Sequence, residues 1–440
     1  MGGADSLRRA LVRGGLGSFT LKIADTVLRL AISIVLARAL APEGYGTYAF
    51  AFSVMTLLSI PVQLGLPLLL VRQVARYHYH AEWGLLRGML QLANRAVFAI
   101  AVVLALIAGT LLWAYRASLP AELAPTFAWT LLLLPLVTLL KLQEATVRGL
   151  RRVVAAQVPT LVLFPGLFLV FLVMGATWDA LSPPRAMSLY CAAAGLALVL
   201  AAAIVARSLP PGLAGATPEY RAREWLSSML PLSLLAGMQI LNSNTDLFML
   251  GVLSSSANVG EYRVAVSGAN LVVFMLAAVN QVVAPHAARL HSAGDHVRLQ
   301  RMVTVSARVV LLSSLPAALV FILFGRFILG FVFGPEYTAA YPALAILCVG
   351  QLVNATMGSV GILLNMSGHE RDTVRGVAVG FAANVVLNAV LIPPFGIVGA
   401  ATATASATVI WNLLLHRTVW KRLGIQSSAL GRVQQHRRDS

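Results

Sequence analysis

The stretch GTYAFAFS, Gly46 to Ser53, returns as GEYRVAVS, Gly260 to Ser267, and this repeat decides the fold. A second similarity follows each copy, because VAR ends at Arg76 and AAR ends at Arg289. The offset between the copies is close to half of the chain. Chance similarity between two apolar segments is the alternative interpretation. The repeat predicts a chain built from two similar halves.

The composition is that of a polytopic membrane protein. Of the 440 residues, 58% are hydrophobic and 11% are charged, whereas soluble domains carry about 25% charged residues. The mean hydropathy is +0.81. The net charge of +17 does not indicate nucleic-acid binding, because the basic residues are scattered in short groups between apolar runs. The two cysteines, Cys191 and Cys348, share no motif spacing, so neither a disulfide nor a metal site is predicted.

The length that a helix needs to cross a bilayer divides the chain into about twelve spans. With ends uncertain by about 2 to 4 residues, they are 16–40, 46–70, 88–114, 124–148, 153–176, 186–207, 225–252, 259–284, 303–331, 339–366, 373–393 and 396–418. The motif IPPFG, Ile392 to Gly396, divides the last two. This pattern predicts an all-α integral membrane protein with two six-helix bundles, 1–210 and 211–423, and a basic cytoplasmic tail, 424–440. With six spans each, the bundles share one orientation, and a substrate site is expected between them.

Basic residues fall mainly on one side of the predicted membrane. Sorting them onto alternate loops places 23 of the 33 lysines and arginines on one side and 4 on the other, namely Arg116, Arg185, Arg263 and Arg326. Cytoplasmic loops carry such an excess of positive charge. Both termini are therefore predicted to be cytoplasmic, and the number of spans to be even.

A polar stripe interrupts the first span, in TLKIADTVLRL, Thr20 to Leu30. Lys22, Asp25 and Arg29 are spaced i, i+3, i+7, which places them on one narrow face of a helix. A charge that faces lipid costs at least about 2.5 kcal/mol near the middle of the membrane. The stripe is therefore expected to face partners or a water-filled cavity.

Three more charges fall at a similar depth in the same half: Arg95 in the third span, and Lys141 and Glu144 in the fourth. Four cations against two acids predict a hydrated, net-positive pocket that opens to the cytoplasm and requires an anion. Paired charges that only hold the bundle together are the alternative. Arg38 and Arg308 lie close enough to span ends for their side chains to extend to the interface.

Two of the chain's three lysines, Lys22 and Lys141, lie within the membrane. Lysine changes its pKa more readily than arginine when it is buried. Either lysine is therefore a candidate to release a proton as the pocket changes its exposure.

The second half carries polar but nearly neutral positions. Gln239, Asn242 and Asp246 repeat the i, i+3, i+7 spacing in the seventh span, and Asn384 and Asn388 lie one turn apart in the eleventh. These groups suit sugar hydroxyls or a coupling ion. Hydrogen bonding between spans is the equally weighted alternative.

Motifs of ATP hydrolysis and of common hydrolases are absent from the sequence. It contains no GxxxxGK[ST], HExxH, GxSxG or CxxC pattern. No loop is long enough to present the acids that a membrane glycosyltransferase would need. An enzyme is not expected, and neither a catalytic residue nor a cofactor is predicted, apart from a coupling proton or sodium ion.

Three stretches carry a resemblance to a known family: Leu36 to Arg76, Asn244 to Ala265 and Leu363 to Thr404. They resemble polysaccharide flippases of the Wzx type, which serve O-antigen, lipopolysaccharide and exopolysaccharide biosynthesis. These flippases belong to the multidrug/oligosaccharidyl-lipid/polysaccharide (MOP) exporter superfamily. The resemblance covers nearly the whole chain and implies a MATE-like, V-shaped pair of bundles. It also implies alternating access, which moves an oligosaccharide on undecaprenyl pyrophosphate to the outer leaflet of the bacterial inner membrane.

The resemblance implies a role for each group of polar residues within the spans. The pyrophosphate is expected to bind the basic residues Lys22, Arg29, Arg95 and Lys141. The acids that would orient these cations or couple transport to an ion are Asp25, Glu144 and Asp246. The neutral wall that would face the glycan or an ion consists of Gln239, Asn242, Asn384 and Asn388.

The expected partners are a lipid-linked oligosaccharide and membrane lipids, with a polysaccharide polymerase and glycosyltransferases as further candidates. A cation-coupled multidrug exporter of the same superfamily is an alternative, although it would favour an acidic, aromatic cavity. A lipid II flippase is a second alternative, although that family typically has two further C-terminal helices. A non-transporting membrane protein would not need the intramembrane charges.

Overall fold

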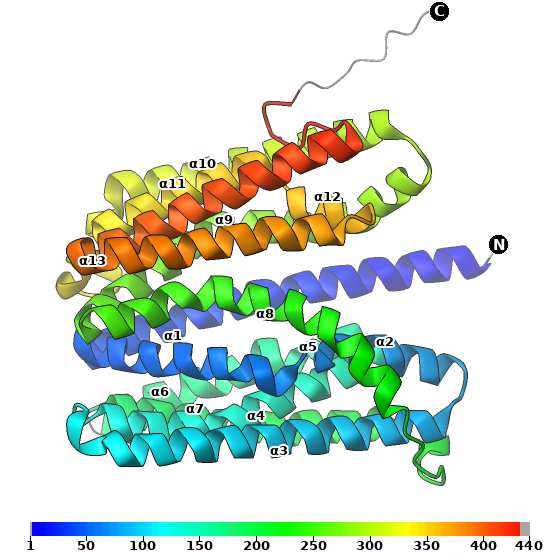
Figure 1. The fold of residues 1–440 in the computed structure, drawn as a ribbon, viewed down its shortest axis with the longest axis horizontal. Helices are drawn as coiled ribbons and strands as arrows, with labels where there is room; N and C mark the ends of the chain where they lie inside the picture. The colour runs from blue at the N-terminus through cyan, green and yellow to red at the C-terminus, as the bar shows by residue number, and fades with distance from the viewer. Residues whose placement is uncertain (1, 179, 432–440) are drawn as a thin grey trace, which may run out of the picture. The chain divides into compact units, whose positions relative to one another are not determined.

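The computed structural model describes the backbone of residues 2–178 and 180–431, and these residues form helices and no strands. Side chains are described from residue 17 onward, except at positions 178, 179, 230, 231, 235 and 281. The first helices are α1 (Gly2–Gln63), α2 (Leu66–Tyr79), α3 (Trp83–Tyr115), η1 (Arg116–Ser118), α4 (Leu123–Gly149), α5 (Val153–Val158), η2 (Pro159–Leu163), α6 (Phe164–Trp178), α7 (Pro183–Ser208) and η3 (Pro211–Leu213). The others are α8 (Ala222–Leu253), α9 (Ser256–Ser292), α10 (His296–Val332), η4 (Pro335–Ala340), α11 (Tyr341–Met357), α12 (Val360–Met366) and α13 (Glu370–Leu423) (Figure 1).

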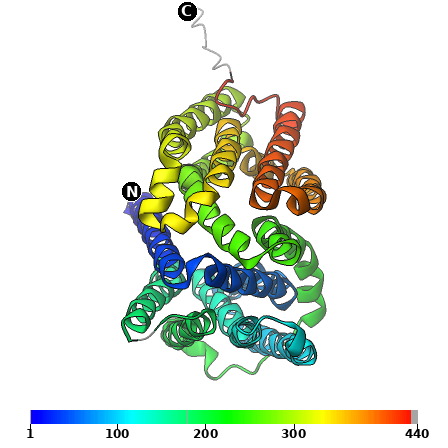
Figure 2. The same cartoon turned by 90° about the vertical axis from the view of Figure 1, so that its left-hand side faces the viewer.

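The helices form two compact units, which divide between Asn244 and Thr245. In unit 1, α4 packs against α1, α2, α3 and α7, and in unit 2, α11 packs against α9, α10 and α13. Figure 2 shows many of these helices roughly end-on. Each unit is a helical bundle of the kind that the apolar spans predict.

Helical segments cover all twelve predicted spans. Eight described helices are long and apolar enough to cross a membrane, or nine when the bent pair α1 and α2 is included. Breaks at Ala41 and Gly396 divide α1 and α13 into two segments each, and α8 covers the seventh predicted span. The predicted all-α membrane fold is therefore confirmed, while α1 begins well before the predicted first span.

The breaks within α1 and α13 follow from proline and glycine. Ala41 has φ 55° and ψ 174° and precedes Pro42, and a residue before proline avoids the helical conformation. In α13 the helix continues through Pro393 and Pro394 and breaks at Gly396, whose φ of 52° favours glycine. The IPPFG motif therefore divides the last two spans as predicted, with the glycine as the point of reversal.

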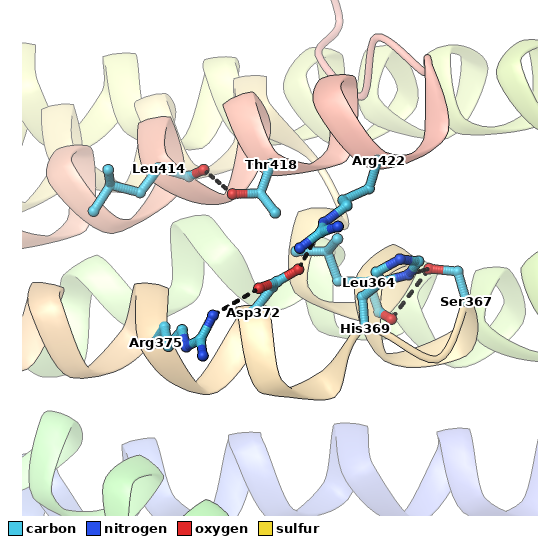
Figure 3. Close-up of polar contacts among 8 residues, drawn as sticks. All are labelled: Leu364, Ser367, His369, Asp372, Arg375, Leu414, Thr418 and Arg422. Atoms are coloured by element: carbon cyan, nitrogen blue, oxygen red, sulfur yellow. Dashed lines mark hydrogen bonds and ion pairs between the residues drawn. The ribbon is translucent and has the colours of Figure 1, made fainter.

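The two halves of α13 are joined by one ion pair at the end of the hairpin, between Asp372 and Arg422. Asp372, in the first turn, accepts from Nε of Arg422 at 3.1 Å, and Nη1 of Arg375 lies 3.7 Å from the other carboxylate oxygen (Figure 3). His369 precedes the helix, with Nδ1 at 3.3 Å from the Ser367 hydroxyl. Asp372 thus links the start of α13 to its last turn.

The division between units lies inside α8, beyond the predicted boundary at 210/211. Trp225, in the first turn of α8, is buried and donates from Nε1 to the Tyr77 hydroxyl of α2 at 2.9 Å. Arg76 of α2 lies 3.8 Å from the Glu224 carboxylate. The start of α8 therefore belongs to unit 1 by its packing, although the repeat assigns it to the second half.

The linker between α7 and α8, residues 209–221, is packed along α3. Arg87 donates from Nη1 to the carbonyl oxygens of Ala214 at 3.0 Å and Ala216 at 2.7 Å. A Cβ on Gly88 would lie 1.9 Å from the Glu219 carbonyl oxygen, so this close approach requires glycine. The linker is a structured part of unit 1.

The C-terminal segment, residues 424–431, turns back after α13 and packs on unit 2 (Figure 1). Arg308 of α10 donates from Nε and Nη2 to two main-chain carbonyl oxygens of this segment, at 3.0 and 3.1 Å. Gln300 and Gln426 exchange two hydrogen bonds of 2.8 Å. Main-chain oxygens of this segment therefore take the donors of Arg308. The rest of the predicted tail, 432–440, lies outside the described residues.

Replacement of Arg308 with alanine should lower the free energy of unfolding by about 1–2 kcal/mol, because two hydrogen bonds to a charged group are lost from a partly exposed site. Thermal unfolding of the purified chain in detergent would measure the change. Arg301→Ala is the matched control, since Arg301 is exposed on the same helix and has no hydrogen bond or ion pair within the described residues. Equal shifts for the two variants would contradict this role of Arg308.

Candidate functional site

Two charged triads with the same spacing lie on α1 and α4. Both follow the pattern Lys-x-x-acid-x-x-x-Arg, and their members are Lys22, Asp25 and Arg29 in α1 and Lys141, Glu144 and Arg148 in α4. The spacing places each triad on one helix face. The sequence analysis missed the role of Arg148, because the predicted span ended there, whereas α4 continues to Gly149.

In each triad the acid pairs with the arginine one turn further along the helix. Nε of Arg29 donates to Oδ1 of Asp25 at 2.6 Å, and Nη1 of Arg148 lies 3.7 Å from Oε1 of Glu144. Neither Lys22 nor Lys141 forms an ion pair within the described part of the chain. In both triads the acid is therefore closer to its arginine than to its lysine, which has no direct ion pair among the described residues.

The triads meet across α1 and α4 with like charges adjacent. The two helices pack together, and their spans run in opposite directions, so the cation Arg29 interacts with the cation Lys141 and the acid Asp25 with the acid Glu144. Like charges repel, more strongly where water is excluded. Pairing within each helix explains the acid–arginine contacts, but a purely structural device would place opposite charges across the interface. The cluster instead contains four cations and two acids.

The charge cluster is accessible from one side. The Arg29 side chain is 52% exposed, while Asp25 is 16% exposed. Lys22 is exposed, and Lys141 and Glu144 are half-buried. The cations can therefore contact a ligand or water, while the acids lie deeper.

A π-helical turn, η2, adds a residue that the sequence analysis did not identify. It packs on both α1 and α4, and Thr160 lies near the Glu144 carboxylate, while its hydroxyl donates to the Gln157 carbonyl oxygen at 3.2 Å. Gln157, one turn earlier, has a buried Oε1 with no hydrogen-bond partner in the described structure. The signal available in the sequence was the presence of two polar residues, Gln157 and Thr160, at the start of an otherwise apolar span.

Arg95 is not brought into this cluster. It lies on α3 between the exposed side chains of Leu92 and Phe98, whereas the packed stripe of this helix contains Ala93 and Val97. Within the described residues it forms neither an ion pair nor a hydrogen bond. The preceding residue, Asn94, contacts α4 instead. Its Oδ1 accepts a hydrogen bond from Nε2 of Gln143 at 3.1 Å.

In unit 2, a buried polar cluster surrounds Asp246. Tyr262 of α9 donates its hydroxyl to Oδ2 of Asp246 at 2.7 Å, and the Thr404 hydroxyl of α13 lies 3.4 Å from the same oxygen. The main-chain N–H of Leu247 donates to Oδ1 at 2.9 Å. Asp246 is only 7% exposed, and the sequence analysis did not identify Tyr262 or Thr404 as its partners.

Asn384 and Asn388 extend the Asp246 cluster along α13. Nδ2 of Asn384 donates to the Thr404 hydroxyl at 3.3 Å, and Nδ2 of Asn388 donates to the carbonyl oxygen of Asn384 at 2.9 Å. Both asparagines are buried, and Oδ1 of Asn388 has no partner within the described residues. An oxygen without a donor in this buried place is suited to a cation or a proton donor.

Gln239 and Asn242 are separate from the Asp246 cluster. Gln239 is exposed and Asn242 half-buried, and neither side chain makes a hydrogen bond within the described structure. Both residues precede the division between the units, whereas Asp246 follows it. The predicted stripe on the seventh span is therefore not a single polar face.

The repeat allows this polar cluster to be compared with its counterpart in unit 1. The offset that pairs Gly46 with Gly260 also pairs Tyr48 with Tyr262, Tyr190 with Thr404, and Ile32 with Asp246. In unit 1 the Tyr190 ring contacts an i, i+4 pair on the preceding span, Phe164 at 4.8 Å and Phe168 at 4.5 Å between ring centroids. In unit 2, Thr404 instead accepts a hydrogen bond from Asn384, which also pairs with Asn388. The surroundings of the paired positions Tyr190 and Thr404 are thus aromatic in unit 1 and polar in unit 2.

Two family models match this chain, and together they cover residues 11–391. The family model described as "Polysaccharide biosynthesis protein" matches residues 11–291, which is more than half of the chain. The chain belongs to this family. The MatE model also matches, over residues 231–391, and the predicted membership of the MOP superfamily is confirmed.

Two proteins of Haloferax volcanii are similar to this chain. The probable low-salt glycan biosynthesis flippase Agl15 is 28% identical over 171 residues, 39% of this chain and 36% of the relative. The probable flippase AglR is 28% identical over 179 residues, 40% of this chain and 37% of the relative. The matched part thus spans little more than a third of each relative.

Solved structures share the fold of this chain. An inward-facing MATE-family multidrug resistance transporter of the MOP superfamily has a TM-score of 0.74 at 13% identity, with 91% of this chain and 94% of that chain covered. The lipid II flippase MurJ in an inward closed conformation has a TM-score of 0.72 at 11% identity, with 93% and 87% covered. The MATE-like fold class is therefore confirmed.

Proposed function

We propose that this chain is a flippase that moves an oligosaccharide linked to a polyprenyl pyrophosphate, with undecaprenyl as the expected carrier, by alternating access. The observation that carries the proposal is the charge cluster of α1 and α4, where the cations Arg29 and Lys141 interact across the two helices and four cations accompany only two acids. A pyrophosphate would supply the missing negative charge. Family membership and the relatives named as probable flippases support the same activity.

The pyrophosphate would bind Lys22, Arg29 and Lys141, with Arg148 as the fourth cation. Arg29 and Arg148 are each oriented by an acid of their own helix, and the two lysines have no ion pair in the described residues. Charge-assisted hydrogen bonds to phosphate are among the strongest polar contacts of proteins. Arg95 has no part in this assignment, since it lies on another face of α3.

The proposed location is the bacterial inner membrane with both termini in the cytoplasm, where the charged ends of α1 and α4 would meet newly made lipid-linked units. The excess of basic residues on one side supports this orientation. The exposed face of the charge cluster would then receive the headgroup from the cytoplasmic leaflet.

A coupling ion would bind near Asp246, as either a proton or sodium. The carboxylate is buried, its neighbours Tyr262 and Thr404 supply oxygen atoms, and hard cations prefer oxygen ligands. In unit 1 the residue paired with Asp246 is Ile32, so the proposal assigns this role to unit 2. Asp25 and Glu144 form a second pair of acids that could share a proton.

Reconstitution would test the proposed function. The purified chain in liposomes should move a fluorescent oligosaccharide on polyprenyl pyrophosphate between leaflets, and the same glycan on a neutral lipid should not move. Parallel liposomes with lipid II or with a cationic dye address the two alternatives. Movement of the dye alone would contradict the proposal, and a proton or sodium gradient imposed across the liposomes would show whether either ion couples.

A further inference from the structure

The membrane span made of α11 and α12 is broken near its end. In a regular helix the N–H of Val360 donates to the carbonyl oxygen of Thr356, four residues earlier. Here it donates to the carbonyl oxygen of Gly358 at 3.0 Å. Gly358 has φ 69° and ψ −150°, a conformation that favours glycine. The break therefore frees the Thr356 carbonyl oxygen from its helical donor.

The C-terminal segment supplies the donor that the helix lacks. The N–H of Ala429 donates to the Thr356 carbonyl oxygen at 2.8 Å. The segment also lies against the break, because a Cβ built on Gly358 would lie 3.0 Å from the Ser427 carbonyl oxygen. Ser427 is fully buried, and its hydroxyl lies 2.7 Å from Nδ1 of His416 in α13. The C-terminal segment is thus docked at the break.

Two side chains of α10 hold the C-terminal segment in this place. Arg308 donates to two main-chain carbonyl oxygens of the segment, at 3.0 and 3.1 Å. Gln300 exchanges two hydrogen bonds of 2.8 Å with the main chain of Gln426. Ile425 adds an apolar contact, since it is 2% exposed and belongs to a core cluster of unit 2. The polar contacts from α10 can therefore be removed without any change to α11 or α12.

The C-terminal segment and a continuous helix compete for the same acceptor. In a continuous helix the Val360 N–H returns to the Thr356 carbonyl oxygen, and Gly358 leaves its positive φ. The Ser359 hydroxyl, which donates to Oδ1 of Asn280 in α9, would then leave this partner. The span therefore has two alternative arrangements, one with the segment docked and one with the helix continued.

We propose that the C-terminal segment is a strap that holds the span of α11 and α12 in its broken arrangement, and that release of the strap lets the helix continue through Gly358. With the strap docked, α12 packs against α9 and α13. These two helices carry Tyr262 and Thr404, the partners of Asp246. Release would realign α12 with α11, so the strap acts on the helices that form the polar cluster of unit 2. This inference goes beyond the proposed function and does not depend on the substrate.

Gly358→Ala distinguishes the two arrangements, because its effect has opposite signs in them. In the broken span the new Cβ meets a positive φ and the Ser427 carbonyl oxygen, whereas in a continuous helix alanine is a better helix former than glycine. In the otherwise wild-type full chain, the substitution should lower the midpoint of thermal unfolding in detergent by about 2–4 °C.

The same substitution is then made in a full chain whose strap is released by Gln300→Ala and Arg308→Ala. In this background Gly358→Ala should leave the midpoint of thermal unfolding unchanged or raise it. A decrease in both backgrounds, or no decrease in the wild-type background, would overturn the inference, because the break would then be a fixed feature of the span.

Hydrogen exchange of the full chain follows the strap and the break directly. The chain with Gln300→Ala and Arg308→Ala should exchange the Ala429 N–H about tenfold faster than wild type. The N–H groups of Ser359 and Val360 should exchange more slowly, because they join the continuous helix. Exchange at these two positions that is not slower would show only a loosened end of unit 2 and overturn the inference, as would unchanged exchange at Ala429.

Arg301→Ala is the matched control for both measurements. Arg301 is exposed on the same helix and forms no hydrogen bond or ion pair within the described residues, so its loss should change neither the exchange pattern nor the effect of Gly358→Ala. Neither measurement requires transport. Failure of the strap inference would therefore leave the proposed flippase function standing, and absence of flipping would leave the strap inference standing.

Discussion

Joint replacement of Arg29 and Lys141 by glutamate should reduce flipping of the pyrophosphate-linked oligosaccharide by about 100-fold or more, because each cation lost from a phosphate contact removes about 1.5–3 kcal/mol. The two cations interact across α1 and α4, so the double variant turns the shared cation position into an acidic one. Flipping by the purified variant in liposomes would measure the loss, with thermal unfolding to show that the chain is folded.

The matched control exchanges the same two residue types outside the cluster. Arg417 and Lys421 lie exposed near the end of α13 and form no ion pair within the described residues. Their joint replacement by glutamate adds the same negative charge and should leave flipping within about twofold of wild type, as for exposed charges in water. Full activity of the Arg29 and Lys141 variant, or equal losses in both double variants, would exclude the proposed anion site.

Asp246→Asn should abolish the dependence of flipping on an imposed ion gradient and reduce the coupled rate by at least about tenfold, since the amide retains the shape but not the charge that a cation needs. Tyr262→Phe should produce a smaller loss of the same kind, because it removes the 2.7 Å hydrogen bond that orients the carboxylate. Flipping with and without proton or sodium gradients would be compared in the same liposomes.

The repeat provides the control for these unit 2 variants. Tyr48 occupies the position of Tyr262 in unit 1, where Ile32 replaces Asp246, so Tyr48→Phe should leave the gradient dependence unchanged. Retained coupling in Asp246→Asn would refute a coupling role for this carboxylate and leave Asp25 and Glu144 as the acids to test. Loss of coupling in Tyr48→Phe alone would assign the role to unit 1.

The sequence predicted the spans well because their signal is length. About 20 apolar residues are needed to cross a bilayer wherever the helix lies, so α3, α4 and α7 match their predicted ranges within a few residues. The break at Gly396 was also predicted, since prolines and glycine act locally.

The candidate site was predicted only in part, because depth in the membrane does not determine the direction in which a side chain points. Lys22, Asp25, Lys141 and Glu144 do come together, whereas Arg95, at similar depth, lies on a face away from the packed stripe. The π turn Pro159–Leu163 packs on α1 and α4, and hydropathy contains no signal for that insertion. Arg308 binds a segment more than a hundred positions away in sequence, which no local pattern reveals.

The packed linker has a consequence for protein engineering. Residues 209–221 and the first turn of α8 form hydrogen bonds to α3 and α2. A chimera of two related transporters that is joined at the end of α7 would therefore take the linker from one parent and the surface that binds it from the other. Gly88 would then meet a foreign main chain at a place with no room for adjustment. A junction inside α8, near Asn244, keeps each linker with its own surface and is the better point for exchanging the halves.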